Sequence, residues 1–177
     1  MALGDIMIHR DGSFGTSGAR KMAVASGAAA TIKAGELVLK APGSPYVVVW
    51  TASNTAKPVV GTDYLAGVST STSTDTAAAD GTVDIISDFM GMVFLGNAEV
   101  PATFGYNTTT GVVTQSTYDA LVGDSVLLKT TAAGVQTLLA SDGNTQGLTI
   151  EPLDVAKFPG KVAFSIKPSC SYLFKVS

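Results

Sequence analysis

Residues 46–51 read Tyr-Val-Val-Val-Trp-Thr, and this run decides the fold class. Its β-branched and aromatic side chains predict a buried strand. The run follows a turn segment, Ala-Pro-Gly-Ser-Pro at 41–45, which itself follows another expected strand at 36–40. Two short apolar runs joined by a Gly- and Pro-rich turn are typical of an antiparallel sheet.

The same pattern continues along the chain, because short apolar runs alternate with segments rich in Gly, Pro, Asn or Thr. Gly accounts for 19 of the 177 residues, which fits many tight turns. We therefore predict an all-β domain over residues 32–177, either an antiparallel β-barrel or a sandwich, with one short helical turn at 116–122. The further strands are expected at 64–68, 82–86 and 90–95, with a strand–turn–strand element at 105–114.

Two stretches of the chain resemble each other. Residues 35–40 (GELVLK) and 123–129 (GDSVLLK) both begin with Gly and an acidic residue and end with Lys. A small-residue turn and an apolar strand follow each of them. Later matches are Gly67 with Gly147, and the Gly-led strands that begin at Gly81 and Gly160. Three interpretations stay open: a duplicated β module with halves 32–96 and 121–167, two halves of one barrel, or chance similarity.

Residues 1–31 differ from the rest, because small residues dominate and Gly would break a helix. We predict an extended N-terminal arm that becomes ordered against a partner; the alternative is a strand with a loose tail. Residues 1–35 carry a local net charge of +2, so the arm could dock on an acidic neighbour. The partner contacts expected in the arm are His9, Arg10, Phe14, Arg20 and Lys21.

The composition excludes several classes of partner. Charged residues make up only 14% of the chain, the net charge is −3 and the pI is about 4.9, which argues against nucleic acid as the main partner. No apolar stretch reaches the roughly 18 residues of a membrane span. The N-terminal sequence lacks the pattern of a signal peptide, so we expect synthesis in a host cytoplasm.

Groups for catalysis are scarce. The single histidine, His9, and the single cysteine, Cys170, fall in no nucleophile or zinc pattern. The acidic residues between 75 and 88 lack the spacing of a calcium loop and are interpreted as a solvated face. A phosphate-binding loop is absent from the sequence. We therefore expect no enzyme, no catalytic or metal-binding residues and no cofactor.

Three motifs follow one another: AGELV at 34–38, LAGVS at 65–69 and DGTVDI at 80–85. In this order they resemble small β-barrel decoration proteins of tailed phages, and 105–114 is similar to the strand–turn–strand element of that family. The resemblance covers about residues 32–165. It implies a structural virion protein that binds the major capsid protein on the outside of an assembled capsid and stabilises the shell by bridging capsomers. It also implies a homotrimer or another homo-oligomer and contributes no catalytic residue.

A receptor-binding or adhesive β-module of a phage fibre or spike is the alternative function. Such a module would also be rich in strands, Thr and Gly. A glycan-processing enzyme would need a pair of carboxylates in a cleft, for which the chain offers only Asp84 with Asp88 or Asp124 with Asp142.

Overall fold

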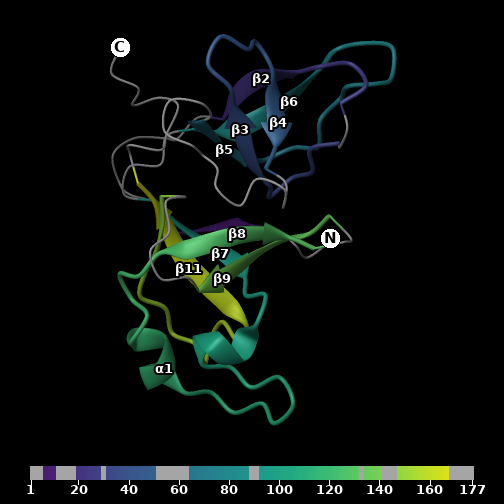
Figure 1. The fold of residues 1–177 in the computed structure, drawn as a ribbon. Helices are drawn as coiled ribbons and strands as arrows, with labels where there is room; N and C mark the ends of the chain where they lie inside the picture. Colours follow the sequence, from purple (N-terminus) through teal and green to yellow (C-terminus); the bar gives the residue numbers. More distant parts are fainter. Residues whose placement is uncertain are drawn as a thin grey trace.

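The computed structural model describes residues 6–10, 19–28, 31–50, 64–87, 92–131, 134–140 and 147–167. Strands dominate these residues, which confirms the predicted all-β, antiparallel fold (Figure 1). The strands are β1 (Met7–Arg10), β2 (Arg20–Val24), β3 (Leu37–Lys40), β4 (Val47–Val49), β5 (Tyr64–Ser69), β6 (Gly81–Ile86), β7 (Val93–Asn97), β8 (Val126–Thr130), β9 (Gln136–Ala140), β10 (Leu148–Ile150) and β11 (Lys161–Ile166). The helical segments are the 3₁₀ helix η2 (Pro101–Phe104) and α1 (Gln115–Asp119).

The first lobe, formed by the described residues between 19 and 87, is a five-stranded sheet in the order β2-β6-β5-β3-β4. It curls until its outer strands meet at a single parallel bridge between Ala23 and Tyr46, so it is not a continuous barrel. Gly67 permits the curl, because a Cβ at this position would lie 2.1 Å from the carbonyl oxygen of Ile86.

The curled sheet buries apolar side chains on both faces. Successive residues of β3 point to opposite faces, so Val38 enters a cluster within the first lobe, whereas Leu37 and Leu39 enter the core that the first lobe shares with the second. Trp50, which is fully buried, also belongs to this shared core. Burying each such side chain contributes about 1.5–3 kcal/mol to the stability of the fold. The contact between the lobes is therefore stabilised in the same way as the rest of the hydrophobic core.

The second lobe consists of β1 and the described residues between 92 and 167. A four-stranded sheet in the order β1-β7-β11-β10 packs with the β8–β9 hairpin. The hairpin is joined to this sheet at two isolated bridges, from Ser125 to Thr149 and from Ala98 to Leu138. Figure 1 shows this lobe below the first one.

The second lobe repeats the strand order of the first. Its strands follow the ring β7-β11-β10-β8-β9, and Ala98–Leu138 is again a parallel bridge between the first and last strands of the ring. The registers also agree: the hydrogen bonds from Gly35 N to Ser69 O and from Ser69 N to Glu36 O have counterparts from Gly123 N to Ile150 O and from Ile150 N to Asp124 O. The pairing of β5 with β6 also matches that of β10 with β11. Val68 pairs with Ile86 as Thr149 pairs with Ser165, and Ser69 pairs with Ile85 as Ile150 pairs with Phe164.

This register corrects two details of the expected repeat. Gly67 corresponds to Leu148 and not to Gly147, whereas the matches of Gly35 with Gly123 and of Gly81 with Gly160 hold. The expected halves, 32–96 and 121–167, also placed β7 in the wrong half and left β2 outside. Each repeat begins one strand earlier than the sequence similarity does, because β2 and β7 share little sequence.

The prediction of an extended arm over 1–31 is wrong for two stretches. Residues 7–10 form β1, which pairs with β7 in the second lobe, and residues 20–24 form β2, which pairs with β6 in the first. The chain therefore contributes a strand to each lobe before β3 begins. Residues 11–18 lie outside the described part of the chain.

A buried amide fastens the two lobes together. Gln136 on β9 is 2% exposed, and its side-chain oxygen accepts a hydrogen bond from the Leu37 N–H at 2.7 Å. Its Nε2 donates to the carbonyl oxygens of Leu37 and Trp50, each at 3.0 Å. The side chain thus satisfies backbone groups of β3 and of the end of β4 that water cannot reach.

We expect Gln136→Met, which keeps the length of the side chain but removes these hydrogen bonds, to lower the free energy of unfolding by about 2–4 kcal/mol, since the buried Leu37 N–H loses its partner and the carbonyl oxygens of Leu37 and Trp50 each lose one of two donors. Urea denaturation measures the change. Gln115→Met is the matched control, because Gln115 also makes hydrogen bonds through its amide but is only half-buried, and water can replace them. Equal losses in the two variants would contradict the role given to Gln136.

Candidate interaction surface

The largest difference between the repeats is the connection from the first strand to the second. In the first lobe β2 and β3 are joined by residues 25–36, whereas in the second lobe residues 98–125 join β7 and β8. This longer connection contains η2, α1 and an isolated antiparallel bridge between Tyr106 and Val113. Residues 100–118, called the tip here, form the lower end of the molecule in Figure 1. The expected strand–turn–strand element at 105–114 is thus reduced to one bridge, and the helical turn expected at 116–122 is α1.

Two buried aromatic rings hold the tip to the second lobe. Phe104 and Tyr118 are 1% and 0% exposed, and their ring centroids lie 6.3 Å apart. The Tyr118 hydroxyl donates a hydrogen bond to the Glu151 carbonyl at 3.0 Å and accepts one from the Ala163 N–H at 2.9 Å. Gly105 allows the chain to turn between the rings: its φ is +78°, and a Cβ there would lie 2.4 Å from the Thr114 oxygen.

Gln115 fastens the other side of the tip. Its Nε2 donates to the Leu153 carbonyl at 2.8 Å and to Asp119 Oδ1 at 2.7 Å, and its Oε1 accepts from the Val155 N–H at 3.0 Å. One side chain therefore ties the start of α1 to the loop between β10 and β11. With the two rings, it makes the tip a fixed part of the second lobe.

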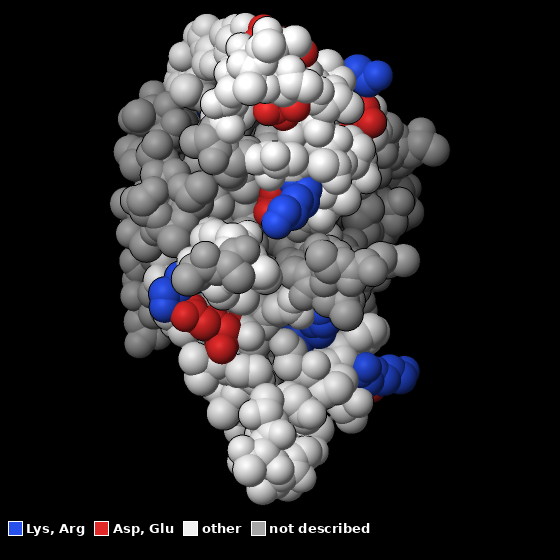
Figure 2. All heavy atoms as spheres, turned by 90° about the vertical axis from the view of Figure 1, so that its right-hand side faces the viewer, with Lys and Arg blue, Asp and Glu red and all other residues white. Residues whose placement is uncertain are grey.

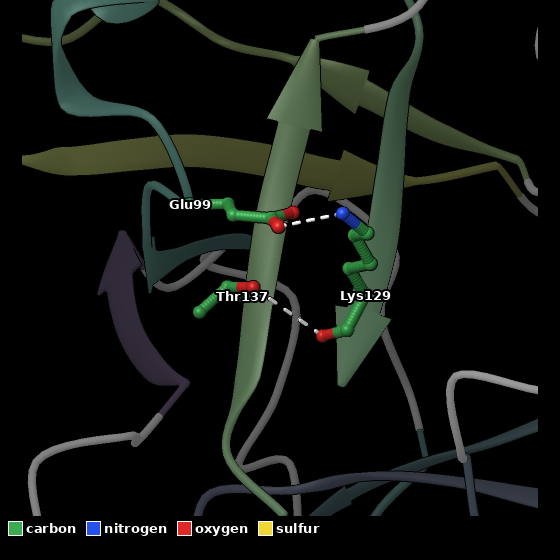
Figure 3. Close-up of polar contacts among 3 residues, drawn as sticks. All are labelled: Glu99, Lys129 and Thr137. Carbon is green, nitrogen blue, oxygen red and sulfur yellow. Dashed lines mark hydrogen bonds and ion pairs between the residues drawn. The ribbon is translucent and has the colours of Figure 1, made fainter. Parts of the chain in front are cut away.

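The base of the tip is tied to the β8–β9 hairpin. Glu99 and Lys129 form an ion pair of 2.6 Å across β9, and Thr137 Oγ1 donates to the Lys129 carbonyl at 3.5 Å (Figure 3). The Glu99 N–H also donates to the Leu138 carbonyl at 2.9 Å. The side chains of Glu99 and Lys129 are 27% and 47% exposed, so the ion pair contributes at most about 1 kcal/mol and serves to orient this connection.

The tip presents an uncharged surface. Residues 100–118 include no Asp, Glu, Lys or Arg, and Val100 and Val112 are 45% and 56% exposed. Figure 2 shows the lower end of the molecule tapering without charged side chains on that face. A hollow of about 320 Å³ opens on the tip, and its walls include Tyr106, Asn107 and Thr110. Such a surface can bind a neighbour by shape and apolar contact with little loss of charge solvation.

Of the five residues expected in the partner contact, the four that the structure describes do not come together in one place. His9 and Arg10 belong to β1 in the second lobe, whereas Arg20 and Lys21 are exposed on β2 in the first. Phe14 lies outside the described residues. The tip was missed as a surface, although its signal was present in the sequence as a long stretch without charge.

Two titratable residues of the first lobe, Tyr46 and Asp80, form an exposed pair. The Tyr46 hydroxyl donates to Asp80 at 2.6 Å, and this hydrogen bond raises the pKa of Tyr46; together with a hydrogen bond from the Ser26 N–H, it lowers the pKa of Asp80. These bonds link the ends of β2, β4 and β6 on an exposed edge. Among the described residues, His, Cys, Asp and Glu form no group suited to a metal ion, and no helix is long and apolar enough to span a membrane.

Comparison of the chain with protein-family models, with curated proteins and with solved structures finds no match in any of the three.

Replacing Tyr118 tests the anchor of the tip. Burial raises the pKa of Tyr118 to about 12 from an ordinary value of 10.0, so the fold favours the neutral phenol. The stability this group contributes is complete below pH 10 and is lost as the pH rises through about 12. We expect Tyr118→Phe to lower the free energy of unfolding by about 1–2 kcal/mol at pH 7 and to flatten its decline above pH 10.

Chemical denaturation at a series of pH values measures both effects. Tyr106→Phe is the control, because Tyr106 is half-buried on the tip and its hydroxyl makes no comparable hydrogen bonds to the residues that the structure describes. An unchanged alkaline decline in Tyr118→Phe would contradict the assignment.

Proposed function

We propose that this chain is a non-enzymatic structural protein of a tailed-phage virion, which binds the outside of the assembled capsid and stabilises the shell by bridging capsomers. The observation that carries the proposal is the tip: an uncharged projection with exposed Val100 and Val112, fastened by buried aromatic rings. A rigid, uncharged projection loses little conformational entropy when it docks, so it suits attachment to a preformed surface.

The rest of the molecule supports the same proposal. Two β lobes share one core, and Gln136 ties them by buried hydrogen bonds, so a load on one lobe is transmitted to the other. A body of this kind can resist separation of the neighbours it touches. Many copies on one shell would give avidity even if each contact were weak, and self-association into trimers would strengthen it further.

A carbohydrate-binding, adhesive role is the second candidate, and the hollow on the tip favours it. Tyr106, Asn107 and Thr110 line this hollow, and an aromatic ring with amide and hydroxyl groups is suited to an uncharged sugar. Selective binding on a carbohydrate array would support this function over shell attachment.

Co-sedimentation with purified, emptied shells of the phage that carries the gene tests the proposal. We expect the full chain to sediment with the shells, and Val112→Glu to bind at least about tenfold more weakly, because a carboxylate on the tip would have to lose its water at the contact. Val48→Glu is the control: Val48 is also about half exposed, at 54%, but lies on β4 in the first lobe.

Failure of the full chain to sediment would overturn shell attachment. Equal binding by the two Val→Glu variants would leave attachment standing but remove the tip from the contact.

A further inference from the structure

The matched registers of the two lobes show that β2 in the first lobe corresponds to β7 in the second, where a further strand, β1, is paired. Arg20 and Lys21 on β2 pair with Ile85 and Asp84. In the second lobe, Phe94 and Leu95 on β7 pair with Phe164 and Ala163, the counterparts of Ile85 and Asp84. Arg20 therefore corresponds to Phe94, and Lys21 to Leu95.

In the second lobe, the other edge of β7 carries an added strand. Met7 and Ile8 of β1 pair antiparallel with Leu95 and Phe94. Phe94 and Leu95 are 0% and 3% exposed in this arrangement. The module thus accepts a sixth strand at this edge without losing its five-stranded ring.

In the first lobe, the corresponding edge is open within the described chain. There β2 pairs with β6, and it meets β4 only at the bridge from Ala23 to Tyr46, beyond the positions in question. Residues 19–21 are exposed, in contrast to their buried counterparts in the second lobe. An edge with unpaired backbone groups is a template for another strand.

We propose that this edge of β2 binds an extended, acidic segment of a partner protein as an added strand. Backbone pairing supplies the affinity and side chains supply the selectivity. Arg20 and Lys21 are neighbours, so they point to opposite faces of the sheet, and both faces of an added strand would meet a positive charge. Carboxylates at neighbouring positions of the incoming strand would answer both charges.

A second copy of β1 is a poor occupant for the same reason. If it docked in the register seen on β7, Arg10 would lie opposite residue 19, on the face of the sheet that also carries Lys21. Like charges on neighbouring strands repel. The basic pair therefore disfavours the β1 strand of a second copy at this edge while it selects an acidic strand, which is how specificity by repulsion works.

The inference deepens the proposed function and rests on it only for the identity of the partner, a shell protein. Because the tip and β2 belong to different lobes, a molecule that used both surfaces could touch two neighbours at once. That arrangement is what bridging of capsomers requires.

An array of ten-residue peptides that vary in charge and in the content of Val, Ile and Thr tests the inference with the full chain. We expect selective capture of peptides that combine Asp or Glu with β-branched residues, weakened by salt. The double variant Arg20→Glu/Lys21→Glu should lose this binding by about tenfold or more. The control, Lys157→Glu/Lys167→Glu, makes the same change of charge at exposed positions of the second lobe and should bind as the unaltered chain does.

Amide hydrogen exchange on the captured complex provides the second measurement, and we expect slower exchange of amides in residues 19–22. Absence of acidic selectivity, equal loss in the two double variants, or unchanged exchange at β2 would each overturn the strand-docking site. None of these results would affect co-sedimentation of the chain with shells, so the two proposals fail separately.

Discussion

The contact between the lobes places a constraint on the whole fold: backbone groups of β3 and of the end of β4 are buried there and need partners. The Gln136 amide meets this need by acting as a short piece of strand, accepting from the Leu37 N–H and donating to carbonyl oxygens on the same side. The surrounding core excludes water from these bonds. A chain without this side chain could still form each curled sheet, but it would join the two mainly by apolar contact, with hydrogen bonds such as those from Ile6 N to Gly35 O and from Thr130 Oγ1 to Trp50 O remaining, which fixes position less precisely.

A repeated module explains why the differences between the lobes are informative. Features that both lobes share, such as the curl, the ring order and the parallel bridge, serve the stability of the module itself. Other features occur in only one of the two lobes: the tip and the strand β1 in the second lobe, and the exposed basic pair on β2 in the first. Connections vary more easily than the strands that hold them, so binding surfaces tend to arise there. The two proposed contacts fall on these differences.

Local sequence was sufficient for much of the fold. The Val-rich run at 47–49, the turn before it and the Gly-led strands were predictable, because β-branched residues and Gly act over a few positions. The repeat was also visible from residue 35 on. The small-residue composition of 1–31 concealed β1 and β2, because their pairing with β7 and β6 depends on distant residues. The roles of Tyr118 and Gln136 were hidden for the same reason: each is defined by contacts with remote backbone groups.

We propose that this molecule is a rigid body that acts by laying its surfaces against neighbours. Electron cryomicroscopy of the phage's own shells, reconstructed with and without the bound chain, tests that directly. We predict density for a five-stranded and a six-stranded lobe on the outer surface, with residues 100–118 seated on one capsid subunit and a strand of another subunit beside β2. Shells on which the chain is found inside the capsid, or attached by a flexible segment with both lobes averaged away, would contradict it.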